Sequence, residues 1–280
     1  MDISAGIVLF NPDINRLNEN ISSIVVQCEH LYLVDNGSSN IETVKKMLKQ
    51  FDDFNITLIL NKKNMGIAKA LNQITAKADD DGYKWILTLD QDSVAPNNII
   101  QEFLKYTNKR NVGIICPVIS DRNKGIEIYR KEGIIEQEEC ITSGALLYID
   151  AWKKIGGFDE SMFIDGVDFD ICYRLRKHNF KILCVQNVIL LHELGRIKYC
   201  RFLFWKVLVK NHSAFRKYYI ARNTIYLARK KNSCSEKIRS VFKEIKLILI
   251  VLAYEDNKKE KIQRIICGIR DGLNMNISYK

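Results

Sequence analysis

Two aspartates separated by one residue are the side chains of this sequence best suited to chemistry. Asp90 and Asp92 follow the run 83–89, whose aromatic and aliphatic residues are typical of a buried strand. Side chains at i and i+2 of an extended backbone point the same way, so both carboxylates can address one point beyond the strand. A pair of carboxylates suits a hard cation such as Mg²⁺, which commonly bridges protein acids to phosphates. A lone Asp-x-Asp can equally be two solvated acids in a turn, so its meaning depends on the rest of the chain.

The segments around this pair alternate between strand and helix patterns. We expect strands near 4–10, 30–35, 56–61, 83–90, 112–119, 140–149 and 181–188, and helices near 14–24, 41–51, 67–78, 98–106, 151–155 and 168–178. This alternation predicts an α/β fold with a largely parallel sheet, which binds ligands at the carboxyl ends of its strands. The polar stretch 120–139 indicates a mobile loop or an exposed hairpin. Beyond residue 201 the pattern predicts amphipathic helices near 201–231, 235–254 and 258–273.

Candidate residues for a nucleotide site follow the other expected strands. They are Phe10, Asn11 and Pro12 after the first strand, Asp35 and Asn36 after the second, and Asn64, Gly66 and Asn72 after the third. Asp35 can bind a base N–H or a ribose hydroxyl, and the helix that starts at Gly66 offers free N–H groups to a phosphate. Taken singly, Asp35-Asn36-Gly37 is an ordinary turn and Asn64 an ordinary helix cap. Only their occurrence together with Asp90-x-Asp92 is specific.

Two common phosphate-binding motifs are absent from the sequence. There is no Gly-x-Gly-x-x-Gly after the first strand and no Gly-x-x-x-x-Gly-Lys-Ser/Thr. Dehydrogenases and P-loop NTPases are therefore disfavoured.

A long, ordered set of motifs resembles the family 2 glycosyltransferases, and within them the rhamnosyltransferases of bacterial surface-polysaccharide synthesis. The set comprises Val8-Leu9-Phe10-Asn11-Pro12, Val34-Asp35-Asn36-Gly37-Ser38, Asn64-Met65-Gly66 with Ala70-Leu71-Asn72, Leu89-Asp90-Gln91-Asp92-Ser93, Thr142-Ser143-Gly144, Gly156-Gly157-Phe158-Asp159-Glu160, Phe163-Ile164-Asp165-Gly166-Val167-Asp168, His192-Glu193-Leu194-Gly195, Tyr218-Tyr219-x-x-Arg222-Asn223 and Gly268-Ile269-Arg270-Asp271-Gly272-Leu273. The resemblance covers nearly the whole chain. It implies a GT-A fold over 1–200, with a mostly parallel sheet flanked by helices, and a C-terminal helical extension over 201–280.

The resemblance also implies roles for single residues. Asp90 and Asp92 would hold Mg²⁺ or Mn²⁺ against the nucleotide diphosphate, with Asp92 as the direct ligand and Asp90 nearer the ribose. His192 would contact the diphosphate or the metal, although a lone histidine is more often structural. Gln91 belongs to the nucleotide site, and Thr142, Ser143 and Gly144 would approach the donor sugar or the acceptor.

The resemblance assigns the catalytic base to Asp168, which would take the proton of the acceptor hydroxyl in one inverting displacement. The sequence has Val167-Asp168 where many relatives have Glu-Asp, so Asp165 and Asp170 remain alternative bases. Asp168 could also cap the helix that follows it, and the two roles are compatible.

Charge is divided unevenly along the chain. Residues 1–195 carry a net charge of −5, whereas residues 196–280 carry +15 and are also rich in aromatic and aliphatic residues. This combination fits the surface of an anionic membrane. A solvated helical face is the plainer interpretation, and nucleic acid is a competing partner that we do not expect.

Cysteines and apolar blocks bear on localisation. The eight cysteines are scattered, without a Cys-x-x-Cys, which favours buried free thiols in a reducing cytoplasm. The N-terminus has no signal-peptide pattern, and the longest apolar block near the C-terminus, 247–254, is too short to span a bilayer. We therefore expect a cytoplasmic protein that is peripheral at the inner face of the cell membrane.

Together these observations predict an inverting, metal-dependent glycosyltransferase. It would move a sugar, plausibly L-rhamnose from dTDP-L-rhamnose, onto a lipid-linked glycan. A UDP-hexose or another donor, and a sugar nucleotidyltransferase, are the alternatives, although Phe10-Asn11-Pro12-Asp13 lacks the Gly-rich basic loop that a nucleotidyltransferase needs. A degenerate relative that binds without turnover is disfavoured by the intact Asp90, Asp92 and Asp168. A homodimer is left open.

Overall fold

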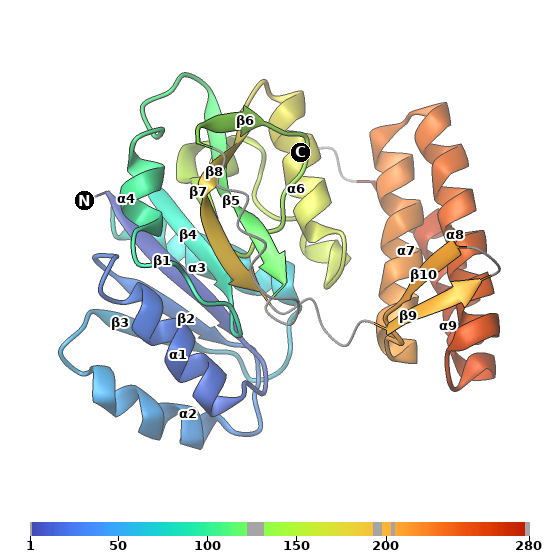
Figure 1. Cartoon of the computed structure of the whole chain (residues 1–280), viewed down its shortest axis with the longest axis horizontal. Coiled ribbons are helices and arrows are strands. Elements are labelled where there is room, and N and C mark those ends of the chain that lie inside the picture. Colours follow the sequence, from blue (N-terminus) through green and yellow to red (C-terminus); the bar gives the residue numbers. More distant parts are fainter. Residues whose placement is uncertain (1, 122–131, 193–197, 203–204, 278–280) are drawn as a thin grey trace. The chain divides into compact units, whose positions relative to one another are not determined.

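The computed structural model describes residues 2–121, 132–192, 198–202 and 205–277 (Figure 1). The chain forms two compact units. Unit 1 contains Met1–Ser161 and Asp168–Glu193, and unit 2 contains Met162–Val167 and Leu194–Lys280. The short segment 162–167 therefore belongs to unit 2, although the residues on both sides of it belong to unit 1.

Unit 1 is built on one mixed sheet. In the described part of the chain its strand order is β3-β2-β1-β4-β7-β5-β8-β6. The strands are β1 (Ile3–Leu9), β2 (Leu31–Asp35), β3 (Ile56–Leu60), β4 (Trp85–Asp90), β5 (Val112–Asp121), β6 (Ile134–Glu136), β7 (Ala145–Tyr148) and β8 (Lys181–His192). Pairing is parallel from β3 to β4 and between β5 and β8, whereas β7 runs antiparallel to both β4 and β5. The predicted α/β class with a mostly parallel sheet is confirmed.

Helices cover both faces of this sheet. They are α1 (Ile14–Ile24), α2 (Ile41–Leu48), α3 (Ile67–Asp80), α4 (Ile99–Leu104), α5 (Ile149–Lys154) and α6 (Val167–Lys177), with short 3₁₀ turns at Lys49–Phe51 and Glu160–Met162.

The alternation of β1 explains how the two faces are filled. Every second residue, from Ile3 to Leu9, joins a buried cluster with residues of α1, α2 and α4. On the other face α3 packs so closely that a Cβ at Gly6 would lie 2.2 Å from Cγ2 of Ile74. Glycine at this strand position therefore sets the distance between helix and sheet.

Unit 2 contains three helices and a two-stranded sheet. Its elements are β9 (Lys198–Phe202), β10 (Trp205–Val209), α7 (Ala214–Lys231), α8 (Cys234–Tyr254) and α9 (Lys258–Asn274). Helices α7 and α9 are in very close contact, because a Cβ at Gly268 or Gly272 would lie 2.4 Å from the carbonyl oxygen of Tyr218 or Arg222. The two glycines lie four residues apart on the face of α9 that contacts α7, and their lack of side chains allows the two backbones to approach closely.

A buried ion network lies at the end of α8. Glu255 accepts from Nζ of Lys217 at 2.6 Å and from Nζ of Lys261 at 3.0 Å, and all three residues are buried. Burial lowers the pKa of Lys217, and the bond to Glu255 opposes that shift. This network ties the start of α7 and the start of α9 to the end of α8.

Three sequence expectations need correction. The helix expected from residue 201 begins only at Ala214, because the preceding residues, rich in aromatic and β-branched side chains, pair as β9 and β10. The strand expected over 140–149 is limited to Ala145–Tyr148, since Gly144 takes a positive φ of 78°. Of the expected loop over 120–139, β6 is a sheet strand, and residues 122–131 lie outside the described chain.

Substitutions at two glycines test the close contact between the loop that follows β2 and the backbone of Lys63. Gly37 has φ +83°, and a Cβ there would lie 2.7 Å from the carbonyl carbon of Lys63, whereas Gly82 has φ +86° with nothing within 4 Å. We expect Gly82→Ala to lower the free energy of unfolding by about 1 kcal/mol, the cost of a left-handed backbone. Gly37→Ala should cost about 3 kcal/mol because the steric clash adds to it. Equal losses in urea melts of the two variants would show that the loop relaxes.

A second stability prediction concerns Glu244, a buried residue of α8. Burial raises its pKa from 4.5 to about 7, with opposing contributions from Thr224 and Lys243. The folded protein therefore keeps a proton that the unfolded chain releases, so this contribution is complete below pH 4.5 and is lost as the pH rises through about 7.

The variant Glu244→Gln isolates this contribution, because its side chain stays neutral. Between these two pH values, wild type should lose on the order of 3 kcal/mol more unfolding free energy than the variant. Urea melts at several pH values measure the difference, and parallel curves would contradict the assignment.

Candidate active site

The sheet brings Asp90, Asp92 and His192 together at one edge. Asp90 is the last residue of β4 and His192 is the last of β8. The two antiparallel steps through β7 restore the strand direction, so β4 and β8 end at the same edge. A bridge between Val94 and Leu191, with N···O 3.1 Å, joins the segments next to these residues.

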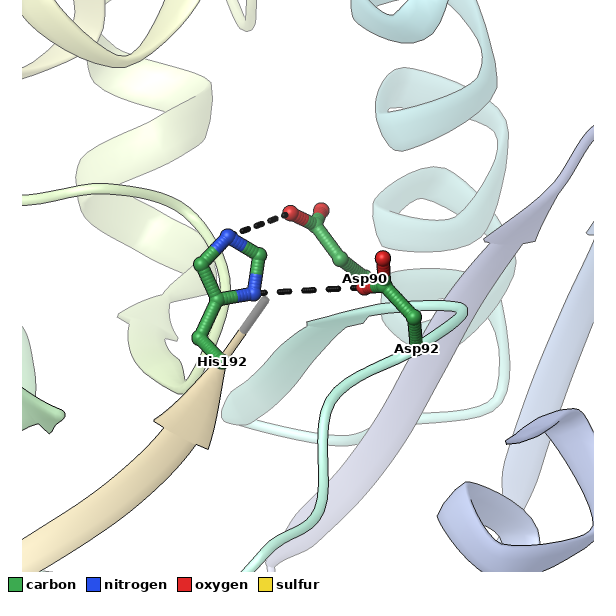
Figure 2. Close-up of side chains that lie close together, drawn as sticks. All are labelled: Asp90, Asp92 and His192. Carbon is green, nitrogen blue, oxygen red and sulfur yellow. Dashed lines mark ion pairs between the residues drawn. The ribbon is translucent and has the colours of Figure 1, made fainter. Parts of the chain in front are cut away.

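The three side chains form a compact group in which the imidazole ring faces both carboxylates (Figure 2). Nε2 of His192 lies 3.7 Å from Oδ2 of Asp90, and Nδ1 lies 3.9 Å from Oδ1 of Asp92. One donor atom from each residue can be chosen so that all lie within 4.8 Å of one another. The carboxylates are 43% and 37% exposed and the imidazole only 13%, so the group opens toward solvent on its acidic side.

This donor set fits a divalent cation. Carboxylate oxygens suit Mg²⁺ and Mn²⁺, and a neutral imidazole nitrogen is a common metal ligand. An ion with bonds of about 2.1 Å places neighbouring ligands roughly 3 Å apart and opposite ligands roughly 4 Å apart. The separations of 3.7 and 3.9 Å between the imidazole nitrogens and the carboxylate oxygens fall within this range. The predicted Asp90, Asp92 and His192 are thus positioned to share one ion.

Neighbouring hydroxyl groups orient these ligands. Oγ of Ser93 lies 3.1 Å from Nδ1 of His192 and 2.7 Å from Oγ of Ser143, and Ser143 accepts from the amide of Asp90 at 3.1 Å. Because Ser93 lies beside Nδ1, a metal would be bound through Nε2. Sequence reasoning assigned Ser143 to the donor sugar or acceptor and did not single out Ser93.

Asn20 also supports the site and was missed from the sequence. Its Nδ2 donates to the carbonyl of Asp90 at 2.6 Å, and its side chain is fully buried on α1. The signal was present, since Asn20 interrupts the apolar face formed by Leu17, Ile21 and Ile24. A polar residue in such a stripe indicates a buried hydrogen bond.

The loops after β1 and β2 are joined at the same sheet edge. Asp35 is buried, and its carboxylate accepts from the amides of Gly37 and Ser38 at 3.1 and 3.0 Å. Oγ of Ser38 accepts from the amide of Asn11 at 2.8 Å, and Nδ2 of Asn40 donates to the carbonyl of Pro12 at 2.9 Å. The predicted nucleotide-binding residues Asn11, Pro12 and Asp35 therefore lie in two loops that are joined by hydrogen bonds.

Asn36 and Asn64 shape the start of α3. Oδ1 of Asn36 accepts from the amide of Met65 at 2.9 Å, while Oδ1 of Asn64 accepts from the amide of Gly66 at 2.9 Å. Asn36 is buried, and its Nδ2 donates to Asn64 at 3.1 Å. These amides hold the turn that leads into α3, whose first residues present their N–H groups at the sheet edge.

Asn72 and Gln91 make contacts within unit 1. Nδ2 of Asn72 donates to the carbonyl of Phe158 at 2.9 Å, and Oδ1 accepts from the amide of Phe158 at 2.8 Å. Gln91 bonds the backbone of Phe10, accepting from its amide at 2.9 Å and donating to its carbonyl at 3.3 Å. Phe10 itself is 45% exposed. The structure thus gives Asn72 and Gln91 positioning contacts in addition to the donor-binding role predicted for them.

A cavity of about 360 Å³ lies beside the metal centre. Ser143, whose hydroxyl holds Asp90, is part of its wall. The rest of the wall comes mainly from β5, β6 and residues 137–141, including Cys116, Gln137 and Cys140. Gly144 has φ +78°, and a Cβ there would lie 2.8 Å from Leu190, so only glycine fits where Thr142-Ser143-Gly144 passes. Sequence reasoning did not name the thiol and amide side chains of this wall.

The three candidate bases have different surroundings. Asp168 is half-buried. Because α6 begins at Val167, Asp168 lies in its first turn and is not the N-cap residue. Asp170 is fully buried and pairs with Arg174 at 2.6 Å. The carboxylate of Asp165 accepts from both Nε and Nη2 of Arg216, at 3.1 and 3.0 Å.

Unit 2 holds the segment that leads into α6. The buried Nδ2 of Asn223 on α7 donates to the carbonyls of Met162, Ile164 and Asp165 at 2.8, 2.7 and 2.7 Å. Arg222 also donates to the carbonyl of Met162, at 2.9 Å. Segment 162–167 has left-handed backbone at Phe163, Asp165 and Gly166. The Arg222-Asn223 motif therefore fixes the chain directly before Asp168.

Comparison with known proteins agrees with this geometry. The family model "Glycosyl transferase family 2" matches residues 4–175. The "dTDP-rhamnosyl transferase RfbF" of Shigella flexneri is 28% identical over 97% of this chain and 95% of its own length. The "Bifunctional glycosyltransferase pgtA" of Dictyostelium discoideum is 34% identical over 41% of this chain and 16% of its own.

Solved structures show the same fold. The mannosyltransferase PcManGT from Pyrobaculum calidifontis, in complex with GDP-Man and Mn²⁺, has a TM-score of 0.62 at 11% identity and covers 99% of this chain and 76% of that one. GalNAc-T7 with UDP, GalNAc and Mn²⁺ also has a TM-score of 0.62, at 14% identity, with 81% of this chain and 47% of that one covered. The fold is GT-A, the protein is a glycosyltransferase, and the chain belongs to glycosyl transferase family 2.

Proposed function

We propose that this enzyme transfers L-rhamnose from dTDP-L-rhamnose to a lipid-linked glycan, with inversion at the anomeric carbon. The observation that carries the transfer chemistry is the group of Asp90, Asp92 and His192 at the ligand-binding edge of the sheet. The donor follows from the match to the dTDP-rhamnosyl transferase RfbF, which extends over nearly the full length of both chains. We assign donor binding and catalysis to unit 1.

A bound divalent ion would offset the charge that gathers on the diphosphate as the glycosidic bond breaks. The chain's own residues do the rest. The N–H groups at the start of α3 meet a phosphate, and Asp35 accepts from the base or ribose. The cavity beside Ser143 holds the sugar or the acceptor. In this proposal Asp90 lies nearer the ribose, and Thr142 and Gly144 approach the sugar.

We assign the base to Asp168. The acceptor hydroxyl gives its proton to the carboxylate while its oxygen attacks the anomeric carbon from the face opposite the diphosphate. The bond from that carbon to the diphosphate oxygen breaks, and its electron pair stays on the diphosphate. Asp168 occupies the position of the base in the family motif and is half-buried, whereas the carboxylate of Asp170 is fully buried.

We propose that this site binds Mn²⁺ more tightly than Mg²⁺. A nitrogen donor from His192 suits Mn²⁺ better than Mg²⁺, which prefers oxygen ligands and keeps several waters.

We also propose that the enzyme works at the inner face of the cell membrane, where a lipid-linked acceptor is held. Support comes from the charge of +15 over residues 196–280. In the described residues, no helix is both long and apolar enough to cross a bilayer. A homodimer remains open and is measured in the last experiment below.

The first functional prediction separates metal binding from proton transfer. Asp92→Ala should weaken Mn²⁺ binding in calorimetry at least about tenfold and abolish rhamnosyl transfer, because a direct ligand is lost. Asp168→Asn should bind Mn²⁺ and dTDP as wild type does, yet lose about a hundredfold or more in kcat. EDTA should abolish transfer, and Mn²⁺ should restore it.

Thermal-shift measurements with Mn²⁺ and a panel of nucleotide sugars identify the donor, because a bound ligand raises the melting temperature. A larger shift with a UDP-hexose than with dTDP-L-rhamnose would overturn the donor assignment. Full turnover in both aspartate variants would overturn the site.

The second functional prediction concerns Asn223, which anchors segment 162–167 directly before the proposed base. Asn223→Asp replaces the donor amide with an acceptor that faces three carbonyl oxygens. We expect kcat to fall about tenfold or more, while the affinity for Mn²⁺ and dTDP stays unchanged, because the loop before Asp168 shifts.

Tyr218→Phe is the matched control on the same helix. It removes a hydroxyl that donates to Asp271 at 2.8 Å and does not touch segment 162–167 through that bond. A similar fall in kcat for both variants would mean that general loosening of α7, and not the anchor, is responsible.

A further inference from the structure

Helix α8 carries an apolar face that points away from the core of unit 2. Its inward residues Ser240, Glu244 and Val251 are buried, and Val251 packs with Ala221 and Ile265. A second set of large apolar side chains is between 48% and 68% exposed: Ile238, Val241, Phe242, Ile245, Leu249 and Leu252. We call these six residues the α8 stripe.

The α8 stripe is continuous along the helix. Its members follow one another at spacings of one, three or four residues, so at 100° per residue they fall within an arc of about 100°. The helix has 21 residues, and at 1.5 Å per residue it is about 30 Å long. Contiguous exposed apolar surface of this kind marks an interaction site, whereas single exposed residues do not.

The borders of the α8 stripe are cationic. Lys243 and Lys246 are exposed on one border, and Lys237 is exposed on the other. Of the two acids of the helix, Glu236 is neutralised by Arg239 at 2.9 Å and Glu244 is buried. The face therefore combines apolar side chains at its centre with positive charge at its edges.

We propose that the α8 stripe lies in the surface of an anionic lipid bilayer, with its apolar side chains among the acyl chains and its lysines at the headgroups. Such a helix lies along the interface, and cations at its edges strengthen binding to anionic lipid. A second copy of the chain would bring the same cationic borders together, which the charges oppose. Nucleic acid would leave the apolar centre unmatched. This inference deepens the membrane association proposed above and places it on α8, not on the aromatic segments 199–206 and 215–219.

Vesicle sedimentation of the full-length protein tests this surface. Wild type should bind vesicles that contain phosphatidylglycerol more tightly than vesicles of phosphatidylcholine alone, and the difference should shrink as salt rises. The double substitution Phe242→Glu and Leu249→Glu should weaken binding to the anionic vesicles about tenfold or more, because two inserted side chains are lost.

The matched control is the double substitution Val26→Glu and Leu60→Glu. Both residues are exposed and apolar, at 69% and 51%, and the change of charge is the same, but they lie in unit 1. This control should bind the vesicles as wild type does. Equal loss in both double variants would assign the effect to net charge, and wild-type binding by the α8 variant would overturn the proposal.

Two further measurements keep the outcomes distinct. If ultracentrifugation found a dimer that the α8 substitutions split, with vesicle binding unchanged, the stripe would be an interface between copies and the proposal would fail. Transfer to a water-soluble acceptor should be unchanged in the α8 variant, so loss of vesicle binding with normal turnover supports the lipid face independently of the proposed reaction. If wild type and all variants failed to transfer rhamnose but bound vesicles as expected, the assignment of the donor would be wrong and the proposal for the α8 stripe would stand.

Discussion

The candidate active site depends on one topological constraint, which is that the strands ending at Asp90 and His192 must point the same way. They are not neighbours in the sheet, since β7 and β5 lie between them. Because β7 is antiparallel to both β4 and β5, direction is reversed twice and β8 ends at the same edge as β4. A single reversal would have placed the imidazole at the opposite end of the sheet, with no metal site.

Strand direction brings Asp90 and His192 to the same edge of the sheet, and hydrogen bonds then fix their geometry. Carboxylates that are 43% and 37% exposed are not held by packing, so their backbone must be fixed from beneath. Asn20 holds the carbonyl of Asp90, Ser143 holds its amide, and Ser93 connects Ser143 to the imidazole. The bond from Nδ2 of Asn20 to the carbonyl of Asp90 explains why a polar side chain interrupts the apolar face of α1.

Much of this arrangement could be predicted from the sequence, and the failures have physical causes. The strands that end at Leu9, Asp35 and Asp90 follow from runs of apolar residues with polar ends, and their parallel pairing follows from the intervening helices. The end of β9 and all of β10 fall within the helix predicted over 201–231, because a short apolar run with charges fits both periods. The partners of Asn20 and Asn223 lie 70 and about 60 residues away, so a local pattern can mark Asn20 as a buried polar residue but cannot identify the group that it binds.

The segment 162–167 shows how tertiary contacts override local preference near the proposed base. Left-handed backbone at Phe163 and Asp165 is unfavourable for residues with a Cβ, so this segment would not keep its shape by itself. Asn223 offsets that cost because the two hydrogens of its Nδ2 are shared among three carbonyl oxygens, and Arg216 adds two hydrogen bonds to the carboxylate of Asp165. The hydrogen bonds from α7 therefore define the backbone of this segment up to Val167, the first residue of α6.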